Sequence, residues 1–234
     1  MALEHLPEIV RLHLADVTRV PDWHPEYAAF QPFPVYGWLI RHPNGLVLVD
    51  TDIAPHPILD EWYGPVITRI EDALRAVGVE PHELAGIVLS HLHFDHCGQQ
   101  SQLLAPVYVQ EAEIEAAKAP RYTPAEALEF GDRLRPLTGD HVLLQGIRLL
   151  ATPGHTPGHQ SVLVEGGGER VVLAAQCAFR GAEIESGEPA VTNLHAVEWR
   201  EAARLSLARV REFAPSTIYL SHDPDPVQLR ARAP

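Results

Sequence analysis

Cysteine is scarce in this chain, which has only Cys97 and Cys177 among its 234 residues. Two cysteines make no disulfide framework, so the fold has to rest on a buried apolar core. Hydrophobic residues make up 46% of the sequence and charged residues 21%, an ordinary composition for a soluble enzyme. We therefore interpret each cysteine first as a small buried residue.

Positive charge is scarce too. Lys and Arg number 18 against 31 Asp and Glu, which gives a formal net charge of −13. This excess repels phosphate backbones and anionic membranes, and it argues against nucleic acid or a membrane as a partner. No apolar run approaches the length of a membrane span, and the first residues lack the basic and apolar regions of a secretory leader. We expect a cytoplasmic protein.

A linker is the third missing feature, because no Pro/Gly/Ser-rich stretch or block of one charge divides the chain. We predict a single domain over residues 1–234 and leave its oligomeric state open. Period-two alternation and hairpin turns such as Asn44-Gly45 predict strands, and helical spacing predicts helices. The predicted strands cover residues 8–20, 35–40, 46–49, 86–90, 106–109, 161–164, 170–175 and 217–220, with a further hairpin over 141–150; the predicted helices cover 66–77, 111–118, 124–134 and 197–213. Hairpins flanked by helices favour two mixed sheets packed face to face with helices outside.

Histidine, by contrast, is concentrated in one short run. Residues 90–98 read Ser-His-Leu-His-Phe-Asp-His-Cys-Gly, directly after an apolar stretch that we interpret as a buried strand. Crowding imidazoles and a carboxylate is unfavourable unless a cation joins them, and these donors suit Zn²⁺, Mn²⁺ or Fe²⁺. A histidine-rich surface loop is the alternative, but the strand-then-turn context favours a metal site. The candidate ligands in this run are His91, His93, Asp95 and His96.

Two further histidines stand at the ends of predicted strands. The segment Thr152-Pro-Gly-His155-Thr-Pro-Gly-His159 follows one strand, and its prolines and glycines fix a rigid turn that can present an imidazole at a defined angle. His222 closely follows the strand at 217–220. His155 and His222 are therefore added to the candidate ligands.

With these motifs, residues 35–223 resemble the metallo-β-lactamase superfamily, and the two histidine segments look most like its N-acyl-homoserine lactonase branch. The resemblance implies a four-layer αββα sandwich, an α/β fold of two mixed sheets with helices outside. It implies one or two metal ions, Zn²⁺ first and Mn²⁺ or Fe²⁺ as alternatives, at one edge of the sheets. By that likeness one ion is bound by His91, His93 and His155, and the other by Asp95, His96 and His222.

The resemblance also suggests supporting roles for two residues. Asp50, at the end of the strand 46–49, would support the metal-binding loop by hydrogen bonding; an ordinary turn-capping aspartate is an equally good interpretation. His159 would orient its turn. Taken alone, however, it is better explained as a hydrogen-bonded structural histidine.

The sequence departs from the family at the end of the third hairpin. The family has an aspartate there that bridges both metals, and here the strand 170–175 runs into Gln176. Three positions further on, Phe179 stands where the lactonases have a tyrosine that contacts the substrate carbonyl. A glutamine oxygen can bind one metal but brings no charge, so we expect a weakened second metal. Cys177 could supply a thiolate ligand instead only if the end of the strand bulged, because strand alternation would otherwise turn it to the opposite face.

These observations predict a metal-dependent, lactonase-like hydrolase that attacks a lactone, ester or thioester carbonyl of a small acyl substrate with metal-bound hydroxide. Asp95 would hold a metal and act catalytically as the proton shuttle. A glyoxalase-II-like thioesterase is one alternative. A metal-binding pseudoenzyme or ligand sensor, which lost turnover with the bridging aspartate, is another.

Overall fold

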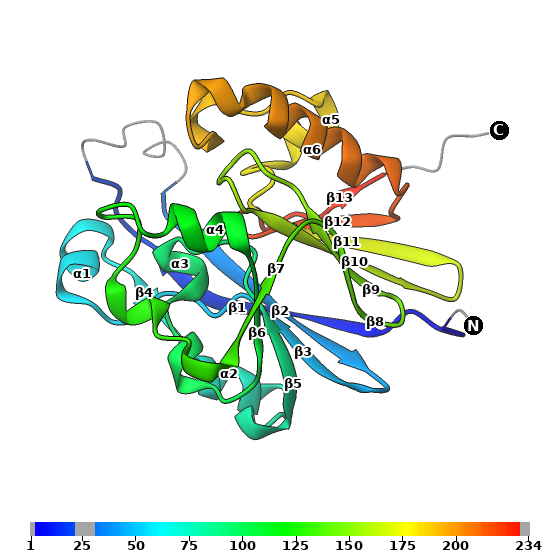
Figure 1. Cartoon of the computed structure of the whole chain (residues 1–234), viewed down its shortest axis with the longest axis horizontal. Coiled ribbons are helices and arrows are strands. Elements are labelled where there is room, and N and C mark those ends of the chain that lie inside the picture. The colour runs from blue at the N-terminus through cyan, green and yellow to red at the C-terminus, as the bar shows by residue number, and fades with distance from the viewer. Residues whose placement is uncertain (1–2, 22–30, 230–234) are drawn as a thin grey trace.

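The computed structural model describes residues 3–21 and 31–229, which form two β-sheets packed face to face with helices on both outer sides (Figure 1). The predicted four-layer αββα architecture is therefore confirmed. One sheet has seven strands in the order β4-β1-β2-β3-β5-β6-β7, and the other has six in the order β13-β12-β11-β10-β9-β8.

The first sheet is built from the N-terminal half of the chain. Long antiparallel strands pair first (β1 with β2, β2 with β3), and β3, β5, β6 and β7 then run parallel to one another. Because these strands are parallel, the loops that follow them emerge at the same edge. Its strands are β1 (Glu8–Val17), β2 (Phe33–His42), β3 (Gly45–Val49), β4 (Val66–Ile67), β5 (Leu84–Val88), β6 (Val107–Gln110) and β7 (Leu134–Leu137).

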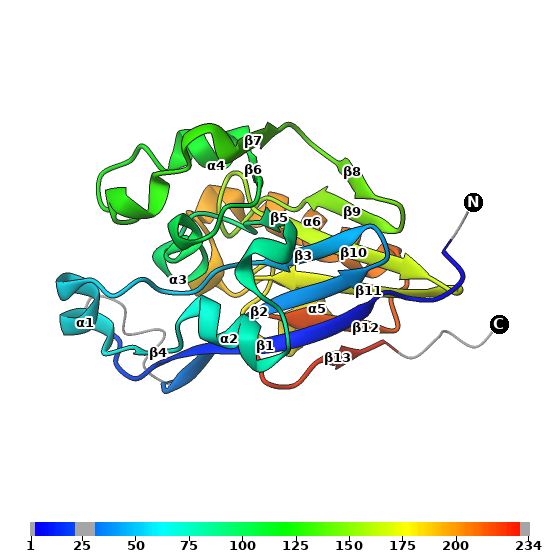
Figure 2. The same cartoon turned by 90° about the horizontal axis from the view of Figure 1, so that it is seen from below.

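The second sheet is built from the C-terminal half (Figure 2). Two hairpins, β8-β9 and β10-β11, are followed by β12, which pairs in parallel with β11. Both hairpins turn on the glycine positions expected from the sequence. The strands are β8 (His141–Leu144), β9 (Ile147–Ala151), β10 (Gln160–Gly166), β11 (Glu169–Ala175), β12 (Thr217–Leu220) and β13 (Val227–Gln228).

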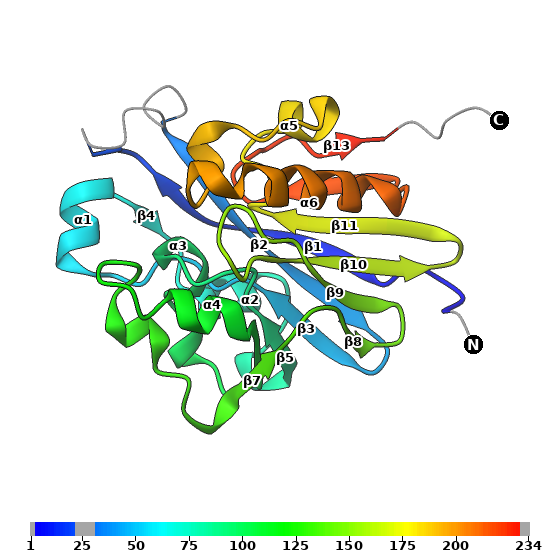
Figure 3. The ribbon, with the colours of Figure 1, turned by 45° about the horizontal axis from the view of Figure 1, so that its top comes forward.

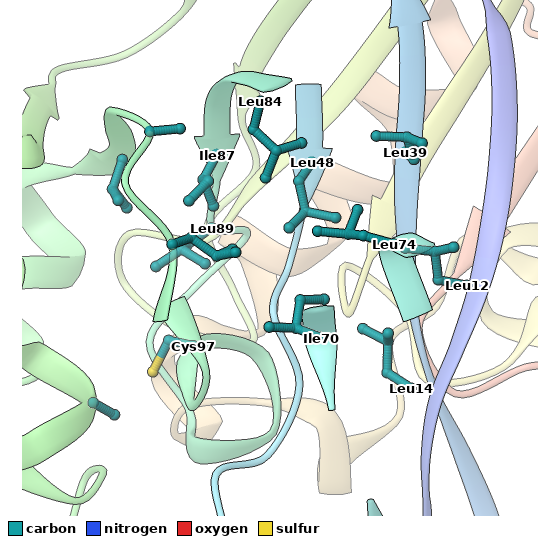
Figure 4. Packing of buried hydrophobic residues seen from close by; sticks show 14 of the residues in the cluster. Leu12, Leu14, Leu39, Leu48, Ile70, Leu74, Leu84, Ile87, Leu89 and Cys97 are labelled. Atoms are coloured by element: carbon teal, nitrogen blue, oxygen red, sulfur yellow. The ribbon is translucent and has the colours of Figure 1, made fainter. Parts of the chain in front are cut away.

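Helices cover the two outer faces. Helices α5 (Gly181–Ser186) and α6 (Arg200–Glu212) lie over the second sheet (Figure 3). Helix α2 (Ile70–Ala76) packs on the first sheet, where its Ile70 and Leu74 contact strand residues such as Leu39 and Leu48 (Figure 4). The remaining helices are α1 (Pro57–Tyr63), α3 (Phe94–Cys97) and α4 (Glu111–Ala116). Among the described residues, no helix combines the length and apolar character needed to cross a bilayer.

Strand alternation explains how one sequence fills both layers of the core. On β2, Leu39 faces the helix layer, whereas Trp38 and Ile40 point between the sheets. There they meet Leu149 and Leu173 of the second sheet. Because every strand near the centre is covered on both faces, the sheets form a rigid frame for the loops at their edge.

Two predicted helices differ from the structure: the first is shorter than predicted, and the second is replaced by 3₁₀ turns. Over residues 66–77, the β-branched pair Val66 and Ile67 forms β4 against β1, so the helix begins only at Ile70. Over residues 124–134, the chain makes two 3₁₀ turns, Ala125–Leu128 and Gly131–Arg133, before it enters β7. Gly131 has a φ of +55°, which ends helical geometry at that point. The short elements α1, α3, α5, β7 and β13 were not predicted.

Candidate metal centre

The predicted ligand residues lie together at one edge of the sandwich, where strands of both sheets end. The run 91–96 follows β5, and Asp50 follows β3. From the second sheet come the turn between β9 and β10, the first residue after β11 (Gln176), and the second residue after β12 (His222). They border a cleft of about 390 Å³ whose lining includes His93, Asp95, His155, Gln176 and His222.

Three imidazoles form the first donor group. His93 Nδ1 lies 3.1 Å from His91 Nε2 and 3.1 Å from His155 Nε2. One atom from each ring lies within 4.8 Å of the others. One ring nitrogen thus faces two others, and a single cation could bind all three nitrogens.

Asp95, His96 and His222 form the second donor group. Asp95 Oδ2 lies 3.5 Å from His96 Nε2 and 3.5 Å from His222 Nε2. All three side chains are buried, so this carboxylate has little water to balance its charge. The donor types suit a divalent transition metal in both groups.

The outer nitrogens of these rings fix which way their lone pairs point. His155 Nδ1 donates to the carbonyl of Asn193 at 3.1 Å, and His222 Nδ1 donates to the carbonyl of Pro34 at 2.9 Å. A carbonyl only accepts, so each neutral ring carries its proton on Nδ1 and its lone pair on Nε2, toward the centre. Neither Asn193 nor Pro34 carries a sequence signal for this role, because each acts through its backbone.

Asp50 hydrogen-bonds both the end of β5 and one ring of the second donor group. Its Oδ1 accepts the backbone N–H of Ser90 at 2.7 Å, and its Oδ2 accepts the Ser90 hydroxyl at 2.8 Å and His96 Nδ1 at 2.9 Å. The carboxylate therefore ties the end of β5 to the ring of His96. His159 is buried nearby, with Nδ1 3.1 Å from the carbonyl of Thr152 and its ring 5.5 Å from that of His91.

Burial and charge set the protonation of the centre. Burial lowers the pKa of His93 and of His222 to about 4, so both rings are neutral at pH 7. Burial also lowers the pKa of His96, but the Asp95 and Asp50 carboxylates outweigh it and raise the pKa to about 10. A positive charge is therefore stabilised at His96 between two carboxylates. Burial opposes ionisation of Asp95, yet the neighbouring His96 holds its pKa well below the usual range.

Glu113, a residue that sequence reasoning missed, joins the two histidine segments. It is fully buried on α4, where Oε1 accepts Leu92 N–H at 2.8 Å and Oε2 accepts Thr156 Oγ1 at 2.6 Å. The remaining donors are Tyr122 Oη at 2.5 Å and Gly158 N–H at 3.0 Å. One carboxylate thus links the loop carrying His91 and His93 to the turn carrying His155. Only its contacts reveal this, because an isolated Glu on a helix carries no motif.

Gln176 and Phe179 both line the cleft. Gln176 Oε1 lies 3.2 Å from His96 Nε2 and 3.2 Å from His222 Nε2. The ring of Phe179 stacks on His222, with centroids 5.0 Å apart, and meets Phe33 edge-on. An apolar ring therefore stands beside the second donor group.

Neither cysteine is placed to supply a thiolate. Cys97 packs in the apolar layer between α2, α3 and the first sheet, and Cys177 packs with Ile184 and Leu207 beneath α5 and α6. Burial raises the pKa of Cys177 to about 12. The register of β11 against β12 shifts between Leu173 and Ala175, but Cys177 still packs against the helices and not toward the donor groups.

Asp50 and Asp52 provide a matched pair for a stability prediction. Both are buried and both have a positive φ, of 63° and 69°, but Asp52 Oδ1 lacks a hydrogen-bond partner among the described residues. Burial also raises the pKa of Asp52 well above its usual range. We expect Asp52→Gly to increase the free energy of unfolding by about 1 kcal/mol, because glycine removes the strain and the unpartnered oxygen.

Asp50→Gly should instead lower the free energy of unfolding by about 3 kcal/mol, because three hydrogen bonds are lost with the carboxylate. Urea denaturation of the metal-free variants measures both changes. Equal destabilisation by the two substitutions would contradict the assignment of strain to Asp52.

The fold and its donors define a four-layer sandwich protein with a two-part candidate metal centre between the ends of its sheets. The family model of the metallo-beta-lactamase superfamily matches residues 30–222. The chain belongs to that superfamily.

Similar proteins include several lactonases. An N-acyl homoserine lactonase of Bacillus sp is 37% identical over 146 residues, which cover 56% of this chain and 58% of that protein. The chain thus matches little more than half the length of this relative. The N-acyl homoserine lactonase AttM of Rhizobium radiobacter is 28% identical, with 82% of each protein covered.

Solved structures agree with the sequence relatives. A quorum-quenching N-acyl homoserine lactone lactonase is 28% identical and superposes with a TM-score of 0.79, over 96% of this chain and 95% of that one. An N-acyl homoserine lactone hydrolase with N-hexanoyl-L-homoserine bound at its catalytic metal centre is 27% identical, with a TM-score of 0.76 and the same coverage. The likeness extends over nearly the whole chain.

Proposed function

We propose that this protein is a metal-dependent hydrolase that opens the ring of N-acyl homoserine lactones. One observation carries the proposal: buried histidines converge from both sheets on a cleft that also holds a carboxylate. His91, His93 and His155 would hold one divalent ion, and Asp95, His96 and His222 the other. The similarity to lactonases supports lactones as the substrate class.

A bound divalent cation would lower the pKa of water and polarise the substrate carbonyl. Asp95 faces the cleft as a carboxylate and would take a proton from the attacking water at Oδ. It would return that proton to the ring oxygen as the acyl C–O bond breaks. Phe179 and Phe33 would pack against apolar parts of the substrate and exclude water.

Two alternatives differ from this proposal. A thioesterase would act on another substrate, and a ligand sensor would bind without turnover. The relatives described above are lactonases, which favours lactone hydrolysis over both. The small-molecule substrate and the cytoplasmic location remain predictions.

A substrate panel tests the proposal. The protein loaded with Zn²⁺, and separately with Mn²⁺, is assayed by proton release on N-hexanoyl and N-decanoyl homoserine lactone, a simple acyl thioester and a phosphodiester. We expect lactone turnover at least about 100-fold above phosphodiester turnover, because the acidic chain disfavours polyanions and the cleft is partly apolar. Turnover of the thioester alone would favour the thioesterase, and bound metal without any turnover would favour the sensor.

A further inference from the structure

The side-chain oxygen of Gln176 lies beside the second donor group. This oxygen lies 3.2 Å from the Nε2 atoms of His96 and His222, which both belong to the second group. Because His222 donates its Nδ1 proton to Pro34, its Nε2 meets this oxygen lone pair to lone pair. Two acceptors at that distance repel unless a cation or a proton lies between them.

Asn193 holds the amide in this orientation. Asn193 Nδ2 donates to the backbone carbonyl of Gln176 at 3.1 Å, which turns Asn193 Oδ1 toward the Gln176 amide. Gln176 Nε2 donates to that oxygen at 3.3 Å. A flipped amide would place two oxygens against each other, so the Gln176 carbonyl is kept toward His96 and His222.

An amide has only one acceptor atom. A carboxylate can give one oxygen to each of two cations, whereas Gln176 has one oxygen beside the second group and an NH₂ bound to Asn193. The second group therefore has four converging donors, Asp95, His96, His222 and Gln176. The first group has three neutral imidazoles.

We propose that Gln176 makes the metal centre unequal: Asp95, His96, His222 and Gln176 form a tight four-donor site, and His91, His93 and His155 form a weaker, open one. This inference rests on the proposed function for the identity of the ligand as a divalent metal. Four protein donors typify closed sites, and three leave a position for water or substrate. The one anionic donor, Asp95, also belongs to the four-donor site, and Asp50 lies behind His96.

The consequence concerns lactone hydrolysis. Turnover should follow occupancy of the open three-histidine site, which exchanges metal readily, whereas the four-donor site stays filled. Activity of the protein should therefore rise with added free Zn²⁺ well after the first equivalent has bound.

Zinc stoichiometry after dialysis into metal-free buffer tests the inference without any substrate. We expect the wild-type protein to retain one equivalent, with the second binding at least about tenfold more weakly in a calorimetric titration. His91→Ala should keep the retained equivalent, and His222→Ala should lose it. Retention of two equivalents by the wild-type protein, or retention by His222→Ala and loss by His91→Ala, would overturn the proposal.

Gln176→Glu is the matched variant, since it keeps the length of the side chain and changes only its charge and its terminal nitrogen. The Gln176→Glu protein should retain the second zinc equivalent. Asn193→Ala should weaken binding of the first zinc equivalent by about tenfold, because the Gln176 amide is then free to rotate. Circular dichroism and thermal melting establish that each variant is folded. If a variant does not fold, the zinc titration of the wild-type protein tests the proposal on its own. A protein that retains one equivalent and binds the second more weakly, but hydrolyses no lactone even at saturating zinc, would refute the proposed function and leave the unequal centre intact.

Discussion

Replacement of His93 by alanine is expected to abolish lactone turnover and the weaker zinc equivalent while leaving the retained equivalent in place. His93 Nδ1 is the atom that faces both other rings of its group, at 3.1 Å from each. Without it two neutral imidazoles remain, too few to hold a divalent ion against water. Because even the outer partners of metal ligands contribute about 10- to 100-fold to activity, loss of a ligand should reduce turnover by at least about 100-fold.

Calorimetric zinc titration and lactone assays on the same preparation measure both effects. His82→Ala is the control, because His82 lies in the short 3₁₀ turn Pro81–Glu83, away from the cleft lining. Wild-type turnover by His93→Ala at saturating zinc would show that the three-histidine group takes no part in the reaction.

Glu113→Gln is expected to have the second large effect. Four donors converge on the Glu113 carboxylate, from Leu92, Tyr122, Thr156 and Gly158. A glutamine of the same shape would set an NH₂ group against two of them, so buried N–H and O–H groups would lose their acceptors. We expect the free energy of unfolding to fall by about 3 kcal/mol and the affinity of the three-histidine site to fall by about 10- to 100-fold.

Two further variants serve as comparisons for Glu113→Gln. Tyr122→Phe removes one donor and leaves the carboxylate in place, so it should cost about half as much stability. Glu111→Gln changes a neighbouring exposed carboxylate on α4 and should change neither quantity. Urea denaturation and zinc titration give the two readouts, and a Glu113→Gln protein with wild-type zinc affinity would show that the carboxylate does not position the histidines.

Local signals in the sequence were sufficient to locate the candidate metal ligands and most of the strands. The run 91–96 and the Pro-Gly turn at His155 can be recognised because their donors are close in sequence and follow apolar strands. Glu113 and Asn193 carry no such signal, because each acts on partners that only the packing of the sheets brings near. The predicted helix over residues 124–134 failed for a related reason: its apolar spacing suits a helix, but Gly131 and the pairing of β7 with β6 decide the structure.

Both sheets contribute residues to each donor group, so a bound metal ion could link them in a protein that has few cysteines for disulfides. Each donor group takes residues from β5's loop in the first sheet and a strand-end residue, His155 or His222, in the second. A divalent ion bound by such a group is a cross-link between distant parts of the chain, comparable to a disulfide but reversible by chelation. The melting temperature should then depend on free zinc concentration, and the availability of metal in its surroundings would set how long the folded protein survives.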